Sequence, residues 1–170
     1  MRLLIHVGIW LAGVWLQASV APAAALWGYR PNLLLLTLLV LVLRWPSPWL
    51  FVYGALAGLA MDSFTHGVLG IYGLSFFATA IAARIAAGFV YDNSTGSALL
   101  VVLAMAWFEG TVAITIFEVM DPATPWWRWW FTRVIPPAFY TALCCPPLLW
   151  AHGWLERRLR WGQASWEFRA

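Results

Sequence analysis

The sequence predicts an all-α integral membrane protein with about six transmembrane helices, and three observations support this fold class. Hydrophobic residues make up 63% of the 170 residues, and charged residues only 10%. The mean hydropathy of +0.76 is too high for a soluble domain of this length, which could not keep that much apolar surface away from water. Most of the 14 tryptophans lie near the ends of apolar runs, where amphipathic rings favour the membrane interface.

The first apolar run predicts an uncleaved helix over residues 3–21. The arginine before the run and the alanines after it also fit a secretory signal peptide. The run is long enough to span a membrane, however, and further apolar segments follow it. Pro22 is expected to end the helix.

Two shorter apolar runs follow, at residues 31–43 and 49–61. At about 1.5 Å per residue, each reaches only about 20 Å, less than a hydrocarbon core of about 30 Å. They fit either two spans in a locally thinned bilayer or a re-entrant pair. Two spans are the preferred interpretation, because a re-entrant pair would place Arg44, in the link between the runs, near the middle of the membrane.

Three more helices are predicted over residues 70–91, 97–120 and about 133–152. A turn at residues 92–96 separates the first two, and residues 121–130 form an interfacial loop rich in tryptophan. The pairs Pro136-Pro137 and Pro146-Pro147 should bend the last helix, because proline removes a backbone donor. Residues 1–153 are therefore expected to form one transmembrane domain, and residues 154–170 a short basic tail that is cytoplasmic or interfacial.

The arginines predict the orientation of the chain. All 10 basic residues are arginine, and six spans would put both termini on the same side. With cytoplasmic termini, seven arginines lie inside and three outside, which is the distribution that the positive-inside rule favours.

A glycine-rich stretch around Asp62 predicts the closest helix packing. Gly54 and Gly58 form a face of small residues, which lets another helix backbone approach closely in lipid. That helix belongs either to the same bundle or to a partner protein. Asp62 follows one turn later, near the interface, where it would cap a helix or order the loop. Three further glycines recur at a spacing of three: Gly67, Gly70 and Gly73.

Glu109 is the most unusual residue, because it lies near the middle of the fifth predicted helix, where an ionised carboxylate is costly. It fits a proton or ligand site, a polar contact between helices or a contact with a partner protein; the helix contact is preferred. Arg84 is expected to extend its guanidinium to the cytoplasmic headgroups of membrane lipids. The residues expected at the depth of Glu109, and so its candidate hydrogen-bond partners, are Gln17, Thr37, Ser75 and Tyr140.

Catalytic and metal-binding patterns are missing from the sequence. It holds no nucleophile, phosphate-loop or metalloprotease motif. His6, His66 and His152 lie in three separate segments, so neither a metal site nor another cofactor is expected. The adjacent Cys144 and Cys145 are expected to be free thiols. We therefore predict neither an enzyme nor a nucleic-acid-binding protein.

Several of these motifs together resemble the rod shape-determining protein MreD family. They are the run Pro-Asn-Leu-Leu-Leu-Leu from Pro31, the Gly54 and Gly58 face followed by Asp62, and the spaced glycines. The likeness covers nearly the whole chain, including the basic C-terminal tail. One departure is Asn32, where the family commonly has aspartate, so a role that needs a charge at this position is not carried over.

The resemblance implies a non-enzymatic scaffold subunit in the bacterial cytoplasmic (inner) membrane. It would act in the rod complex, or elongasome, which elongates the cell and controls its shape. The resemblance also implies binding to an MreC-like bitopic protein and, through the complex, association with MreB, RodA and a class B penicillin-binding protein of peptidoglycan synthesis. The implied fold is similar to the S components of energy-coupling-factor transporters.

That similarity supplies an alternative function, a small-molecule (vitamin) binding S component. Such a subunit needs a polar pocket on the outer side, where Asp62, His66, Tyr72, Arg128 and Arg133 are predicted to lie. Tryptophan and proline dominate the longest outer loop, which favours the scaffold. A purified sample examined for bound small molecules would separate the two functions.

Overall fold

The computed structural model describes residues 2–44, 47, 49–65, 68–90, 94–120 and 126–159 of the chain. Over these ranges the protein is all-helical, and its only β pairing is an isolated bridge between Leu26 and Tyr29. The elements are α1 (Arg2–Ala23), α2 (Leu33–Arg44), α3 (Trp49–Thr65), α4 (Ile71–Val90), α5 (Thr95–Met120), α6 (Trp126–Trp129), the π-helix η1 (Trp130–Val134), α7 (Ile135–Leu143) and α8 (Cys145–Leu159).

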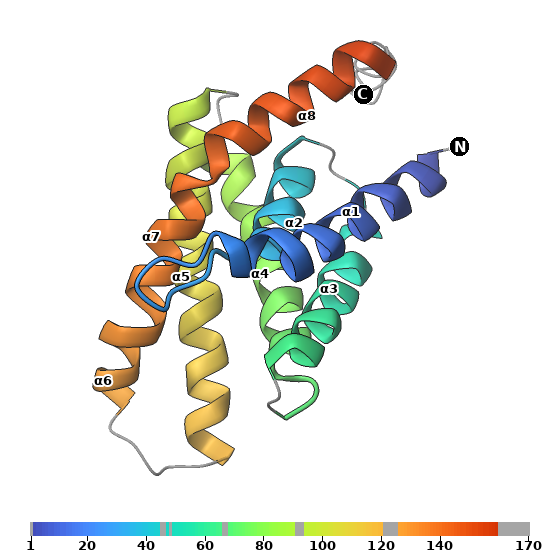
Figure 1. Ribbon diagram of the computed structural model, residues 1–170. Helices are drawn as coiled ribbons and strands as arrows, with labels where there is room; N and C mark the ends of the chain where they lie inside the picture. The colour runs from blue at the N-terminus through green and yellow to red at the C-terminus, as the bar shows by residue number, and fades with distance from the viewer. Residues whose placement is uncertain are drawn as a thin grey trace.

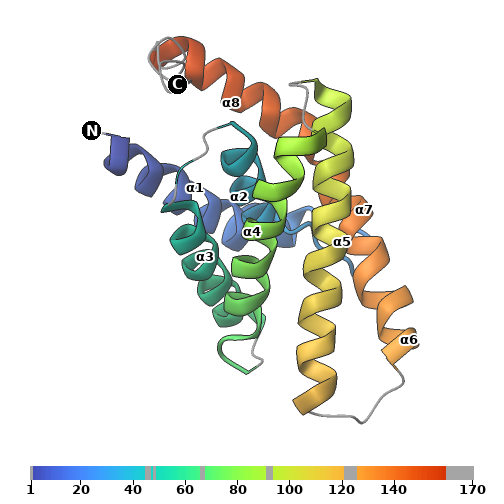
Figure 2. The ribbon, with the colours of Figure 1, turned by 180° about the vertical axis from the view of Figure 1, so that it is seen from behind.

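The helices form one bundle with two distinct ends (Figure 1). At the lower end in this view, α3 ends and α4 begins, and α5 ends and α6 begins. At the upper end, α4 ends and α5 begins, and the start of α1 and the end of α8 lie toward this end as well (Figure 2). The first and last helices therefore approach the same end of the bundle, while α1 runs obliquely across it.

α2 lies in the centre of the bundle. Its residues Leu34 to Leu43 are all buried, and α2 contacts α1, α3, α4, α5, α7 and α8. Figure 1 shows that α2 begins at about half the height of α5, where the link from α1 passes beside α7, and runs to the upper end. With 12 residues, it is about 18 Å long. α2 therefore occupies one half of the bundle height, and its N-terminus lies deep inside the protein.

Three helical stretches of the described chain are long and apolar enough to cross a membrane: Ile71–Phe89, Thr95–Met120 and Trp127–Trp154. Three further apolar helices are shorter, namely Val7–Ala23, Leu33–Arg44 and Trp49–Thr65. The expected all-helical membrane fold is confirmed, but the count of six full spans is not. The short α2 does not have to match the thickness of the membrane, because other helices surround it.

The last helical stretch differs from its predicted form. Residues 126–129, expected in a loop, form the helical turn α6, and a π-helical turn follows before α7. Pro136 and Pro137 occupy the first turn of α7, where a missing N–H leaves no bond unmade. The interruption falls instead at Cys144, just before the second proline pair. α8 then continues to Leu159, through the position at which the basic tail was expected to begin.

Candidate functional site

The Gly54 and Gly58 face packs against α4. A Cβ atom on Gly58 would lie 2.1 Å from the Tyr72 carbonyl oxygen and 2.5 Å from the Gly73 Cα, and these are backbone atoms that cannot rotate away. A Cβ on Gly54 would lie 3.1 Å from the Phe76 carbonyl oxygen. The structure therefore places both glycines in a backbone-to-backbone contact between α3 and α4, within the bundle.

Asp62 ties the end of α3 to the start of α4. Its side chain is only 2% exposed. One carboxylate oxygen accepts hydrogen bonds from the backbone N–H groups of Gly70 (2.8 Å) and Gly73 (3.3 Å), and the other accepts from Tyr72 (3.0 Å). Gly70 has a φ of 103°, a conformation that glycine adopts without strain. Asp62 therefore caps α4 from the preceding helix; Gly67 and His66 lie outside the described residues.

The buried N-terminus of α2 is capped in a similar way. The side-chain oxygen of Gln17 accepts hydrogen bonds from the N–H groups of Leu33 (2.8 Å) and Leu34 (3.2 Å), and Asn32 accepts from Leu35 (3.0 Å). The first N–H groups of a helix have no partner within it, and leaving them bare in an apolar interior is expensive. These two amides make it possible for α2 to begin deep inside the bundle.

α7 holds the same link from the other side. The backbone N–H of Asn32 donates to the Thr141 hydroxyl at 2.9 Å, and Thr141 is 1% exposed. The Tyr140 hydroxyl donates to the carbonyl of Ala24. The link between α1 and α2 is therefore bound to α7, more than a hundred residues away in sequence.

None of the four expected partners of Glu109 forms a hydrogen bond with it. Gln17 caps α2, and Tyr140 bonds the link after α1. Thr37 and Ser75 each donate to the backbone carbonyl four residues earlier, at 2.7 and 2.8 Å. The expected hydrogen bonds to Glu109 are therefore wrong. Each of the four side chains bonds a backbone group that lies nearer to it, and the depth of a residue in the membrane does not predict such a partner.

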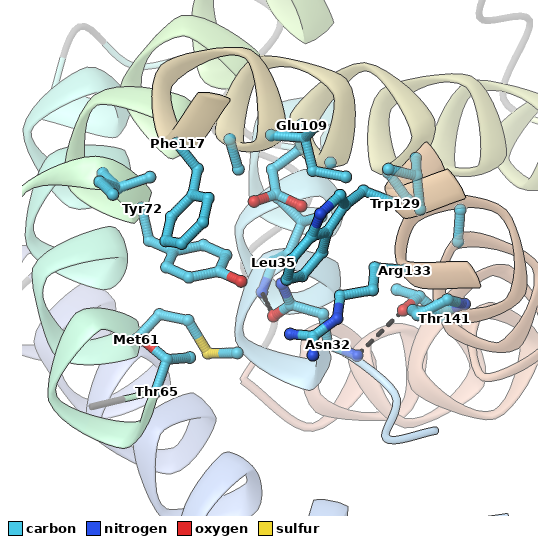
Figure 3. Close-up of a pocket in the computed structure, with 18 of the residues that line it drawn as sticks. Asn32, Leu35, Met61, Thr65, Tyr72, Glu109, Phe117, Trp129, Arg133 and Thr141 are labelled. Atoms are coloured by element: carbon cyan, nitrogen blue, oxygen red, sulfur yellow. Dashed lines mark hydrogen bonds between the residues drawn. The ribbon is translucent and has the colours of Figure 1, made fainter. Parts of the chain in front are cut away.

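Glu109 instead faces a pocket of about 320 Å³. The pocket lies between α3 and α4 on one side and α5, η1 and α7 on the other. Figure 3 shows the Glu109 carboxylate, the Tyr72 hydroxyl, the Asn32 amide and the Arg133 guanidinium directed toward the same space. Glu109 is 6% exposed, and its Oε1 has no hydrogen-bond partner in the described chain.

Aromatic contacts position the basic wall of this pocket. The Arg133 guanidinium lies 4.2 Å from the centroid of the Trp129 ring, a distance typical of a cation–π contact. The Trp130 indole donates to the Thr111 hydroxyl at 3.1 Å. A Cβ on Gly110 would approach a Val134 methyl to 2.9 Å, so η1 packs closely against α5 beside Glu109.

The sequence model of the family described as rod shape-determining protein MreD matches residues 1–140. The chain belongs to the MreD family. The matched range includes α1 to α5 and most of the pocket wall, and the resemblance carried by the sequence motifs is confirmed. No curated protein and no solved structure matched the chain.

The predicted site residues of this MreD-family protein separate into groups. Gly54, Gly58 and Asp62 meet at the α3–α4 contact, and Glu109 lies apart from them across the pocket. Arg84 is exposed on α4 and is not part of the pocket wall. In the described residues, no group of three or more His, Cys, Asp or Glu side chains could hold a metal ion.

Three functional features of this MreD-family protein could not be found, or were not found, from the sequence: the Asn32 cap, the Thr141 contact and the pocket. Asn32, directly before an apolar run, carries the usual signal of a helix cap, and that signal could have been used. The contribution of Thr141 has no such signal, because its partner is Asn32, 109 positions away. The pocket itself arises only where helices distant in sequence meet.

Replacing Gln17 with leucine is expected to lower the free energy of unfolding by about 2 kcal/mol, because the N–H groups of Leu33 and Leu34 lose their acceptor in a buried site. Gln17→Glu keeps an accepting oxygen at this position and should retain most of the stability. Thermal unfolding of the detergent-purified protein measures the difference. Equal midpoints for Gln17→Leu and wild type would contradict the capping role.

Proposed function

We propose that this MreD-family protein is a non-enzymatic scaffold subunit of the bacterial cell-elongation complex. Family membership gives it a role in rod-shape determination. The finer proposal is that it binds an MreC-like bitopic protein and thereby supports peptidoglycan synthesis. The observation that carries the proposal is the family match over residues 1–140.

The hydrogen bonds of the buried polar side chains support a scaffold function. Asp62, Gln17 and Asn32 are all engaged with backbone N–H groups, so their role is to hold helices in place. Large apolar side chains remain exposed on α4 and α5 and are available to lipid or to a partner helix; they include Phe77, Ile81, Ile85, Leu100, Trp107 and Phe108. A rigid core with an apolar outer surface suits a subunit that binds other membrane helices.

A co-purification experiment tests the partner. The tagged protein is co-expressed with an MreC-like bitopic protein, with an unrelated bitopic protein of similar length as the control. We expect the MreC-like protein to be retained and the control to be lost. RodA, the class B penicillin-binding protein and MreB should be recovered only when the MreC-like protein is present. Failure to retain the MreC-like protein at matched membrane levels would contradict the proposal.

We also propose a location in the cytoplasmic membrane with both termini in the cytoplasm, and an architecture similar to the S components of energy-coupling-factor transporters. Two features support the orientation. The start of α1 and the end of α8 approach the same end of the bundle (Figure 1), and the arginine distribution favours that end as the inner one.

A C-terminal fusion tests this orientation. We expect a reporter that is active only outside the cytoplasm, such as a periplasmic phosphatase, to be inactive when joined to the C-terminus. A reporter that is active only inside should give full signal at the same expression level. The opposite pair of results would show that the C-terminus lies outside.

The pocket favours a second candidate function, a vitamin-binding S component. A volume of about 320 Å³ lies at the small end of the range of ligand pockets. Mass spectrometry of small molecules released from the purified protein separates the candidates. A single vitamin-like compound at one equivalent, together with no retained MreC-like protein, would favour the transporter subunit.

A further inference from the structure

The carboxylate of Glu109 needs a partner that the described chain does not supply. Glu109 lies 11 positions before the end of α5 at Met120, which is about 16 Å at 1.5 Å per residue. At this depth its Oε1 is buried and unbonded, and it faces the pocket (Figure 3). A buried acceptor without a donor is unfavourable, and more so when it is charged. The occupant of this pocket should therefore carry a hydrogen-bond donor, best a cationic one.

Two arginines on the pocket wall carry the charge opposite to that of Glu109. Arg133 and Arg30 both border the pocket, and both are exposed rather than buried. The other acidic groups on the wall are Glu118, which is half-buried, and Asp62, whose two oxygens are occupied by three backbone N–H groups. The basic wall therefore has two cations against one available carboxylate, which favours an anionic group on that side.

The rest of the wall limits the size and the source of the occupant. It is mainly apolar and aromatic, with Met61, Ile71, Ile114, Phe117 and Trp129 around the polar groups. The volume of about 320 Å³ accommodates a headgroup or a small metabolite and not a whole lipid. Thr65 and Val68 beside the α3–α4 link, and Phe117 and Glu118 near the end of α5, also border the pocket. The pocket therefore extends from mid-bundle toward the end of the bundle, where lipid headgroups lie.

We propose that this pocket binds a small zwitterionic group, with its ammonium at Glu109 and its phosphate or carboxylate at Arg133 and Arg30. Two sources share this chemistry: the headgroup of a phospholipid with a primary ammonium, and a free zwitterion of the same size. The ammonium donates the hydrogen bonds that Glu109 lacks, and the guanidinium groups bind the anion. The proposal does not depend on the scaffold function.

Native mass spectrometry of the detergent-purified full chain tests the proposal. The probes are phosphatidylethanolamine, phosphatidylglycerol, which has the phosphate but no ammonium, and free phosphoethanolamine. We expect wild type to retain phosphatidylethanolamine or phosphoethanolamine in preference to phosphatidylglycerol. Glu109→Gln keeps the shape and removes the charge, and should weaken binding of the preferred probe about ten-fold or more, the loss of one charge-assisted hydrogen bond. Arg84→Gln removes an exposed arginine away from the pocket and should change nothing.

The probes distinguish a lipid headgroup from a free zwitterion. Binding of phosphatidylethanolamine that depends on Glu109 supports a lipid headgroup, and binding of free phosphoethanolamine alone with the same dependence supports a free zwitterion. Equal retention of both lipids by wild type, or an unchanged preference in Glu109→Gln, overturns the proposal. Retention of no probe also overturns the proposal, and the hydrogen-bond partner of Glu109 would then be water or Arg133. If Glu109→Gln does not fold, Arg133→Gln at the exposed wall serves instead, and it should weaken both phosphate-containing lipids about ten-fold.

Discussion

Gly58→Leu is expected to abolish accumulation of the folded protein in the membrane. Even the first side-chain atom at this position would lie 2.1 Å from the Tyr72 carbonyl oxygen and 2.5 Å from the Gly73 Cα, so α3 and α4 would have to separate. Overpacking in a core typically costs about 1–3 kcal/mol. Here the loss should be larger, because the atoms in the way are backbone and the contact is disrupted along both helices.

Gly88 provides the matched control for this prediction. It lies on α4 and is exposed, and a Cβ there would have no other atom within 4 Å. Gly88→Leu should therefore accumulate like wild type, and Gly54→Ala, with its nearest contact at 3.1 Å, should be intermediate. The measurement is the amount of monodisperse protein extracted from membranes at equal expression. Normal accumulation of Gly58→Leu, with loss only of a co-purified partner, would instead place this face at a partner interface.

Asp62→Ala is expected to produce the second largest loss of stability, about 3 kcal/mol or more. The substitution strands three backbone N–H groups at the start of α4, and each unsatisfied buried donor costs roughly 1–3 kcal/mol, less where water can enter. The loss of local stability should be largest in the link between α3 and α4, because the Asp62 carboxylate connects the end of α3 to the start of α4.

Hydrogen exchange and thermal unfolding of the purified protein measure both effects. We expect faster exchange at Gly70, Tyr72 and Gly73 in Asp62→Ala. Asp62→Asn keeps one carbonyl oxygen and should lose about half as much stability. Ser63→Ala serves as the control, because the neighbouring Ser63 is exposed and its hydroxyl donates to the carbonyl of Leu59, within α3. If Asp62→Ala and Ser63→Ala unfold at the same temperature, the carboxylate does not cap α4.

The helices themselves could be predicted closely, because their signals are local. Apolar composition, prolines and interfacial tryptophans mark the segments that become α1, α2, α3, α4 and α5. The glycine spacing at Gly54 and Gly58 identified a face bare enough for close approach, although a sequence does not specify which helix approaches. Asp62 was expected to cap a helix or order a loop, because it follows an apolar run and precedes a glycine-rich link.

The last helical stretch shows where local signals were insufficient. Four prolines predicted a bend, but proline in a first turn removes a donor that has no acceptor, so Pro136 and Pro137 leave α7 intact. The break at Cys144 lies just before Pro146 and Pro147, the pair that was also expected to bend this helix. α7 itself begins directly after the π-turn η1, which packs on α5 at Gly110.

Residue types and their order along the chain were enough to establish a helical membrane protein, the MreD family and the position of a buried carboxylate at Glu109. Only the tertiary structure decided that α2 begins at mid-height, with Gln17 and Asn32 as its caps, and that Thr141 holds the link before it. It also decided that Glu109 faces a pocket and not the polar residues at its depth. The physical reason is that a helix end can be buried anywhere its N–H groups find acceptors. Acceptors such as Thr141 come from residues distant in sequence, which no local pattern connects.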